Sequence, residues 1–122
     1  MATDRRVLRV NSLLKEVIAD IIQKDIYNPD VSKFTSVTEV DISKDLRHAK
    51  VYISVIGNEE EKQKTVLALQ SASGFIAQTL KKKKVVIPHL PELIFKIDRG
   101  IEHQIRIDTV LEKIHKEQQS RN

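Results

Sequence analysis

Residues 66–84 read VLALQSASGFIAQTLKKKK, and this stretch decides how the chain folds. Its apolar residues recur at helical spacing from Val66 to Leu80, but Gly74 interrupts them. A glycine inside a helix costs roughly 0.5 to 1 kcal/mol relative to alanine, so something must compensate for it. The pattern therefore predicts either a glycine required by close packing or two helices that meet at a corner of small residues, Ala72 to Gly74.

Helical periodicity continues on both sides of this stretch. Apolar residues within 7–22 recur at spacings of three and four, and the helix they predict must end before Asn28-Pro29. Asn58 is a suitable N-cap for the next helix, because the acidic residues 59–61 follow it. A last helix is predicted after Gly100, with a polar end that frays. Its apolar stripe is Ile107, Val110, Leu111 and Ile114.

Alternation of apolar and polar residues predicts three strands, at residues 38–42, 49–55 and 93–97. The short connection 43–48 makes the first two an antiparallel hairpin, whereas helices separate the second from the third and allow a parallel pair. The order α-β-β-α-kink-α-β resembles the type II KH arrangement. We therefore expect an α+β, KH-like domain with a three-stranded mixed sheet and a C-terminal helix.

The length of 122 residues is that of one domain, so we expect a single KH-like domain over residues 1–122 with an ordered core at about 5–115. The chain has no cysteine, which excludes disulfides and thiolate metal sites. No stretch approaches the roughly 18 apolar residues that span a bilayer, and the N-terminus lacks a secretory pattern. We expect a cytoplasmic protein with no membrane partner.

Positive charge is concentrated in one part of the chain. The net charge is +4, and no Asp or Glu occurs from Lys62 to Pro91, a window that holds six lysines. A local basic region favours a polyanion, because neutralising phosphates releases condensed counterions. An acidic protein or a membrane surface is the alternative partner.

Four consecutive lysines, Lys81 to Lys84, are the leading candidates for phosphate contact. Lysines at a helix C-terminus also compensate the helix dipole, but one or two suffice for that. Arg5, Arg6 and Arg9 could extend the basic surface from the first helix, or belong to a solvated terminus.

Nothing in the sequence predicts catalysis or a metal site. The four histidines are too scattered for a local ligand pair, and there is no phosphate-binding glycine loop or nucleophile elbow. Most aromatic residues lie in apolar-patterned elements, Phe75 and Phe34 among them, so core packing is expected rather than base stacking; only Tyr52 alternates outward. We expect no enzyme, no cofactor and no small-molecule substrate.

Several motifs follow one another along about residues 5–115. They are Asn28-Pro29, Ser43-Lys44-Asp45-Leu46, Ala49-Lys50-Val51-Tyr52, Ala72-Ser73-Gly74-Phe75-Ile76, Pro91-Glu92-Leu93, Asp98 and Arg106-Ile107. Taken together and in this order, they resemble the bacterial ribosome-binding factor A family. An Ala-x-Gly kink stands in that family where other KH domains have a G-x-x-G loop, which this chain cannot form.

The resemblance implies a monomeric RNA-binding assembly factor that docks on the free small (30S) ribosomal subunit and its 16S rRNA. It further implies a role in late maturation and rRNA processing, without cleavage by this protein. In that reading Ala72, Ser73 and Gly74 admit the RNA backbone, Gln78 hydrogen-bonds it, and Lys81 to Lys84 neutralise phosphates. The alternative is a KH-like adaptor whose basic segment binds an acidic protein without RNA contact, and RNase treatment separates the two.

Overall fold

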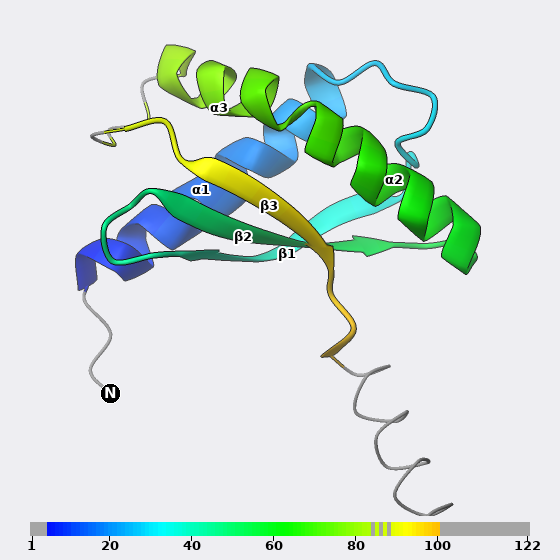
Figure 1. The fold of residues 1–122 in the computed structure, drawn as a ribbon, viewed down its shortest axis with the longest axis horizontal. Coiled ribbons are helices and arrows are strands. Elements are labelled where there is room, and N and C mark those ends of the chain that lie inside the picture. The colour runs from blue at the N-terminus through cyan, green and yellow to red at the C-terminus, as the bar shows by residue number, and fades with distance from the viewer. Residues whose placement is uncertain (1–4, 84, 86, 88, 101–122) are drawn as a thin grey trace, which may run out of the picture.

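Three helices cover one face of a three-stranded sheet in the computed structural model, which describes residues 5–83, 85, 87 and 89–100 (Figure 1). The elements are α1 (Arg5–Lys24), β1 (Thr35–Ile42), β2 (His48–Val55), α2 (Glu59–Ser71), α3 (Ser73–Lys82) and β3 (Glu92–Ile97). Their order is the one that the periodicity predicts. The expected C-terminal helix lies outside the described residues.

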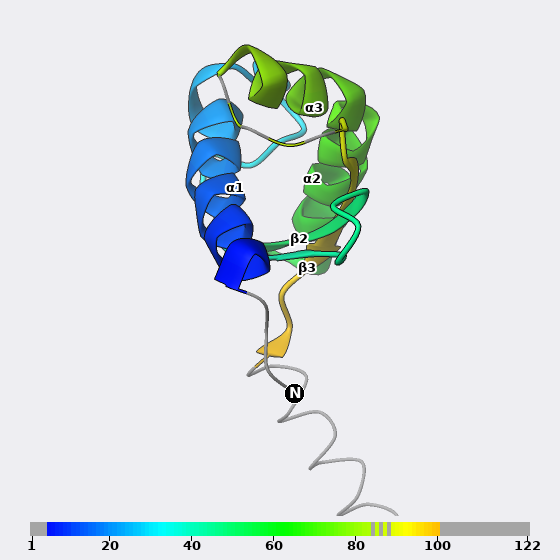
Figure 2. The same ribbon diagram turned by 90° about the vertical axis from the view of Figure 1, so that its left-hand side faces the viewer.

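The sheet is mixed, which confirms the predicted α+β fold. Its strand order is β1-β2-β3, with β1 and β2 antiparallel and β2 and β3 parallel. The hairpin fixes the first pairing, and the two helices α2 and α3 form the crossover that a parallel second pairing needs. Seen from the side in Figure 2, α1 stands opposite α2, with α3 across the end.

The first strand begins earlier than the alternation predicts. It starts at Thr35, and the pairing register shifts between Val37 and Glu39. Because this bulge adds one residue, Val37 and Val40 both face the core although they are an odd number of positions apart. Strict alternation of apolar and polar residues therefore predicted only the part of β1 that follows the bulge, residues 38–42.

The core lies between the helices and the inner face of the sheet. Its fully buried members come from every layer: Leu14 and Ile18 of α1, Val51 of β2, Leu69 of α2 and Ile76 of α3. The apolar stripes that the sequence placed on α1 and on the interrupted helix are thus the faces that meet.

Side-chain amides from the helices form hydrogen bonds with backbone groups of both outer strands. The Asn11 side chain accepts a hydrogen bond from the backbone N–H of Ile42 at 2.8 Å. At the other edge of the sheet, the Gln70 amide donates to the Leu93 carbonyl at 2.9 Å and accepts from the Phe95 N–H at 3.0 Å. These hydrogen bonds fix α1 and α2 against the strands they cover.

Candidate nucleic-acid interface

The interrupted helix bends at Ala72, as the small-residue corner predicted. Asn58 caps α2, since its side chain accepts from the Glu61 N–H at 2.8 Å, and α2 ends at Ser71. The Ala72 N–H still donates to the Ala68 and Leu69 carbonyls, both at 3.1 Å, and its carbonyl accepts from Ile76 at 2.9 Å. No side chain caps the start of α3. The corner therefore carries an uncapped helix start beside a small-residue surface.

Gly74 is not a packing glycine. It is exposed, and a Cβ added to it would meet nothing within 4 Å. Its φ is not positive either, so neither the backbone nor a neighbouring atom requires glycine here. Of the two explanations that the sequence left open, close packing is excluded, and an open surface at the corner remains.

The outward side of α3 carries an aromatic, an amide and a cation at helical spacing. Phe75, Gln78 and Lys82 are exposed, and steps of three and four residues place them on one face. The opposite face is buried through Ile76 and Leu80. We call the surface formed by the corner and the outward side of α3 the kink face. It consists of the half-buried Ala72 and Ser73 and the exposed Gly74, Phe75, Gln78, Lys81 and Lys82.

The four lysines do not share one environment. Lys81 and Lys82 are exposed and make no ion pair with any residue that the structure describes. Lys83 instead extends to α1, where its Nζ lies 3.3 Å from Asp20 Oδ2 and 3.6 Å from Asp25 Oδ2. Lys84 lies outside the described residues. Two lysines are thus available to a ligand, while Lys83 holds α3 against α1.

Asp20 accepts hydrogen bonds from two lysines, Lys24 of its own helix and Lys83. Hydrogen bonds from Lys24 and then Lys83 lower the pKa of its carboxyl below the ordinary value of 3.8. Lys24 makes the shorter ion pair, at 2.9 Å. The carboxylate is therefore ionised throughout the neutral range, and the pairing with Lys83 persists there.

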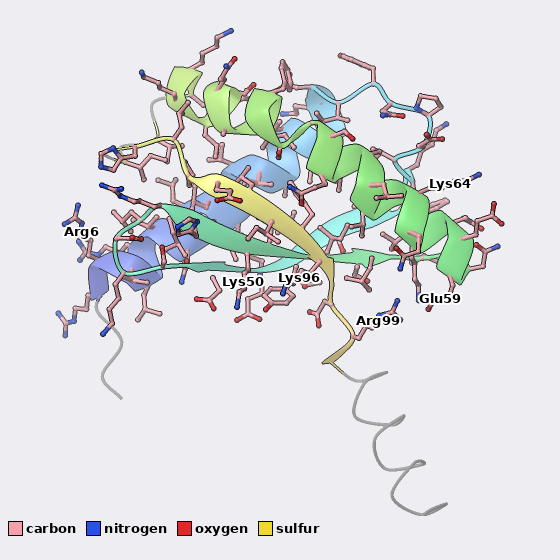
Figure 3. The ribbon with its side chains drawn as sticks, viewed as in Figure 1. Arg6, Lys50, Glu59, Lys64, Lys96 and Arg99 are labelled. Carbon is pink, nitrogen blue, oxygen red and sulfur yellow. The ribbon has the colours of Figure 1, made fainter. Side chains whose placement is uncertain are left out.

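The arginines at the start of α1 lie apart from the kink face. Arg5, Arg6 and Arg9 are exposed, and the start of α1 lies at the bottom of the helical layer in both views, whereas α3 lies at its top (Figures 1 and 2). Figure 3 shows Arg6 at this end. The structure does not join the arginines to the lysines in one continuous basic surface. They form a separate region.

The sheet face that the helices leave uncovered carries both signs of charge. Lys50 and Lys96 point away from the helices (Figure 3). The acidic Asp41 lies directly opposite Lys50 in the β1–β2 register, and Glu39 lies opposite Tyr52. Mixed charge of this kind attracts a polyanion less than lysines with no acidic residue beside them in the sequence.

Three aromatic side chains are outside the core, contrary to the sequence expectation. Tyr27, Phe34 and Phe75 are all exposed, whereas Phe95 is buried as predicted. Phe75 immediately precedes Ile76, and a helix turns about 100° per residue, so burying Ile76 and Leu80 directs Phe75 outward. Attention to the helix register could have found this from the sequence.

A buried hydroxyl that sequence reasoning missed positions the loop before β1. Thr65 of α2 has no exposed surface, and its Oγ1 accepts from the Ser32 N–H at 3.2 Å. It also lies 3.3 Å from the Asp30 carbonyl and 2.8 Å from that of Glu61. An open groove of about 720 Å³ lies beside this loop, lined partly by Ile26, Tyr27 and Val31 and distinct from the kink face.

Within the part of the chain that the structure describes, no group of three or more His, Asp or Glu side chains could hold a metal ion. None of the helices there has the length and apolarity to cross a bilayer.

An ion pair of Arg99 with Glu59, with N–O distances of 3.0 and 2.7 Å, connects the end of β3 to the start of α2 (Figure 3).

Known proteins are similar to this chain in sequence and in fold. The sequence profile of a family described as Ribosome-binding factor A matches residues 6–111. A ribosome-binding factor A from Protochlamydia amoebophila is 50% identical over 117 residues, which are 96% of this chain and 88% of that protein.

Solved structures agree. The crystal structure of ribosome-binding factor A from Thermus thermophilus has a TM-score of 0.67 and 26% identity, over 77% of this chain and 98% of that one. A homology model of the T. thermophilus factor, fitted into a cryo-EM map of a 30S–RbfA complex, has a TM-score of 0.58 and 25% identity, over 73% and 91%. With a profile that spans most of the sequence and a relative identical at half of the aligned positions, this chain belongs to the ribosome-binding factor A family.

Proposed function

We propose that this protein is a non-enzymatic assembly factor that binds the free small (30S) ribosomal subunit through its 16S rRNA. It acts in the cytoplasm as a monomer during late maturation, and it assists rRNA processing without cleaving RNA. It needs no cofactor and no small-molecule substrate. The T. thermophilus relative fitted into a 30S–RbfA complex supports the choice of the small subunit.

The kink face is the observation that carries this proposal. It presents a glycine with open space around it in the first turn of α3 and two exposed lysines in the last turn, on a segment without a single acidic residue from Lys62 to Pro91. Phosphate groups need cations that are not already paired, and a backbone can approach most closely where no side chain projects. Both conditions are met along α3, the second at its first turn and the first at its last.

The residues divide the work by position. Ala72, Ser73 and Gly74 admit the RNA backbone, Gln78 donates a hydrogen bond to it, and Lys81 and Lys82 neutralise phosphates. We also assign a phosphate-neutralising role to Lys84, because it continues the run of four lysines in the sequence. Lys83 acts indirectly, because its pairing with α1 fixes the direction of the helix that carries the other lysines. Arg5, Arg6 and Arg9 contact a second segment of RNA at the far end of α1.

The test is the affinity of the purified protein for free small subunits and for complete ribosomes, measured side by side across a salt series. We expect a preference for the free subunit and an affinity that falls steeply with salt, because binding to phosphates releases counterions. Equal binding to both, or none to either, would contradict the proposal. Persistence of the complex after RNase treatment would favour the adaptor that binds an acidic protein.

Charge-reversed variants locate the site. The double variant Lys81→Glu, Lys82→Glu should weaken subunit binding and reduce the salt slope by roughly one unit for each phosphate that is no longer neutralised. The control is Lys44→Glu, Lys96→Glu, which makes the same change in net charge at exposed positions outside α2 and α3. If both variants lose the same affinity, the effect is one of overall charge and the kink face is not the site.

A further inference from the structure

Phe75 is exposed without any evident structural need. It is 51% accessible to solvent, in the first turn of α3. Because about half of Phe75 stays in water, the fold gains only part of the free energy that full burial of the ring would supply. The ring is therefore available to a ligand, and its surroundings indicate which one.

Those surroundings are open, polar and basic. Gly74 leaves the space beside the ring's backbone empty, with nothing within 4 Å of an added Cβ. Gln78 and Lys82 lie three and seven residues further on, which is about 4.5 and 10.5 Å along the helix axis. No acidic side chain occurs between Lys62 and Pro91. An apolar ring two helical turns from cations that pair with no described residue, with no carboxylate nearby in the sequence, is complementary to a nucleotide, which offers a flat base and a phosphate a few ångströms away.

We propose that Phe75 stacks on an unpaired base of RNA while Lys81 and Lys82 hold the adjoining phosphates. This inference rests on the proposed function and specifies the form of RNA that the kink face prefers: a single-stranded segment, which the ring can stack on, over a continuous duplex, which only the lysines can contact. Bases inside an A-form helix are stacked on each other and offer no free face, whereas a splayed base can lie flat on an aromatic ring. Gly74 gives the sugar and phosphate of that nucleotide room to pass over the corner.

The chain contains no tryptophan, so Phe75→Trp places a single indole at the site. We expect this variant to bind an unstructured RNA oligonucleotide as the original protein does, and its fluorescence to be quenched on binding. The same quenching should follow addition of free small subunits. A duplex of the same length should bind through phosphates with little change in emission. Unchanged emission with both the oligonucleotide and the subunit would overturn the proposal.

Removal of the ring gives the second measurement. Base–aromatic stacking corresponds to about a 5- to 150-fold change in affinity. Phe75→Leu should lose at least the lower figure for the single-stranded oligonucleotide, with the salt slope and the duplex affinity unchanged. Lys81→Glu, Lys82→Glu should instead lower both affinities and flatten the slope. The matched control is Tyr27→Leu, which removes an exposed aromatic ring away from the kink face and should leave RNA binding as it was.

The outcomes separate this inference from the function on which it rests. If the protein binds free subunits in the salt series but Phe75→Leu binds both the oligonucleotide and the subunit normally, the stacking role is wrong and the assembly factor stands. If Phe75→Leu weakens subunit binding only, and that binding survives RNase, the ring contacts protein and the inference is overturned. If subunit binding itself is absent, the proposed function fails.

Discussion

The Thr38 hydroxyl donates a hydrogen bond of 2.6 Å to Asp98 Oδ2, and so links the bulge in β1 to the end of β3 across the central strand. Asp98 Oδ1 also accepts from the Gly100 N–H at 3.0 Å. Together these donors lower the pKa of the Asp98 carboxyl below 3.8, with the Thr38 hydroxyl the larger cause. One carboxylate thus holds both outer strands in register at the point where the alternation breaks.

Thr38→Val should lower the free energy of unfolding by about 1 kcal/mol at neutral pH, because it removes one hydrogen bond to a charged acceptor. A carboxyl with a depressed folded pKa adds stability above its unfolded pKa, and the contribution disappears as pH falls through the folded value. The difference between the two proteins should therefore be full at pH 7 and shrink below about pH 3.8. Urea denaturation at neutral and acid pH measures it. A gap that widens on acidification would contradict the assignment.

Lys82→Ala and Lys83→Ala should affect different properties of the protein, although the two residues are neighbours. Lys83→Ala removes the ion pairs with Asp20 and Asp25 and should cost up to about 1 kcal/mol of stability, with the loss reduced at high salt. Lys82→Ala should leave thermal unfolding unchanged and weaken subunit binding. Thermal melts and binding measured on both variants check this. Equal loss of stability would show that the described ion pairs do not set α3 in place.

Gly74→Ala should raise the stability by roughly 0.5 to 1 kcal/mol, since the new methyl group meets no atom and alanine favours the helix. Gly74→Leu should also fold, but its side chain occupies the space over which the RNA backbone passes, so subunit binding should fall. Circular dichroism melts and the salt-series assay measure the two effects. Normal binding by a folded Gly74→Leu protein would remove Gly74 from the interface.

Thr65→Val should destabilise the protein by about 1 to 3 kcal/mol, because the half-buried Ser32 N–H loses its acceptor and the Thr65 oxygen that accepts it is fully buried. Thr65→Ser keeps the oxygen and should lose much less. Hydrogen exchange at the Ser32 amide should accelerate in the valine variant alone. Equal stability of the two variants would mean that the hydroxyl does not account for the effect.

Helical and strand periodicity predicted the element order and the mixed sheet, because each apolar stripe has only one large surface to bury against. Asn58 as N-cap was also readable, since capping depends on residues within one turn. The bulge in β1 could not be predicted in this way, because Thr38 at the bulge is hydrogen-bonded to Asp98, which is sixty residues away. For the same reason the charge of Lys83 could be counted but its partners on α1 could not be foreseen. The error at Phe75 was different in kind: the register of α3 contained the answer.

The side-chain amides of Asn11 and Gln70 have a consequence for how copies of this protein meet. An outer strand with unpaired backbone groups is a template for another strand, and proteins that expose long edges tend to polymerise through them. Here one amide occupies the Ile42 N–H of β1, and another occupies both a donor and an acceptor of β3. A strand arriving from a second molecule would have to displace a helix side chain at either edge. A strand added at either edge would therefore gain fewer new hydrogen bonds than it would at an edge whose backbone groups were all unoccupied.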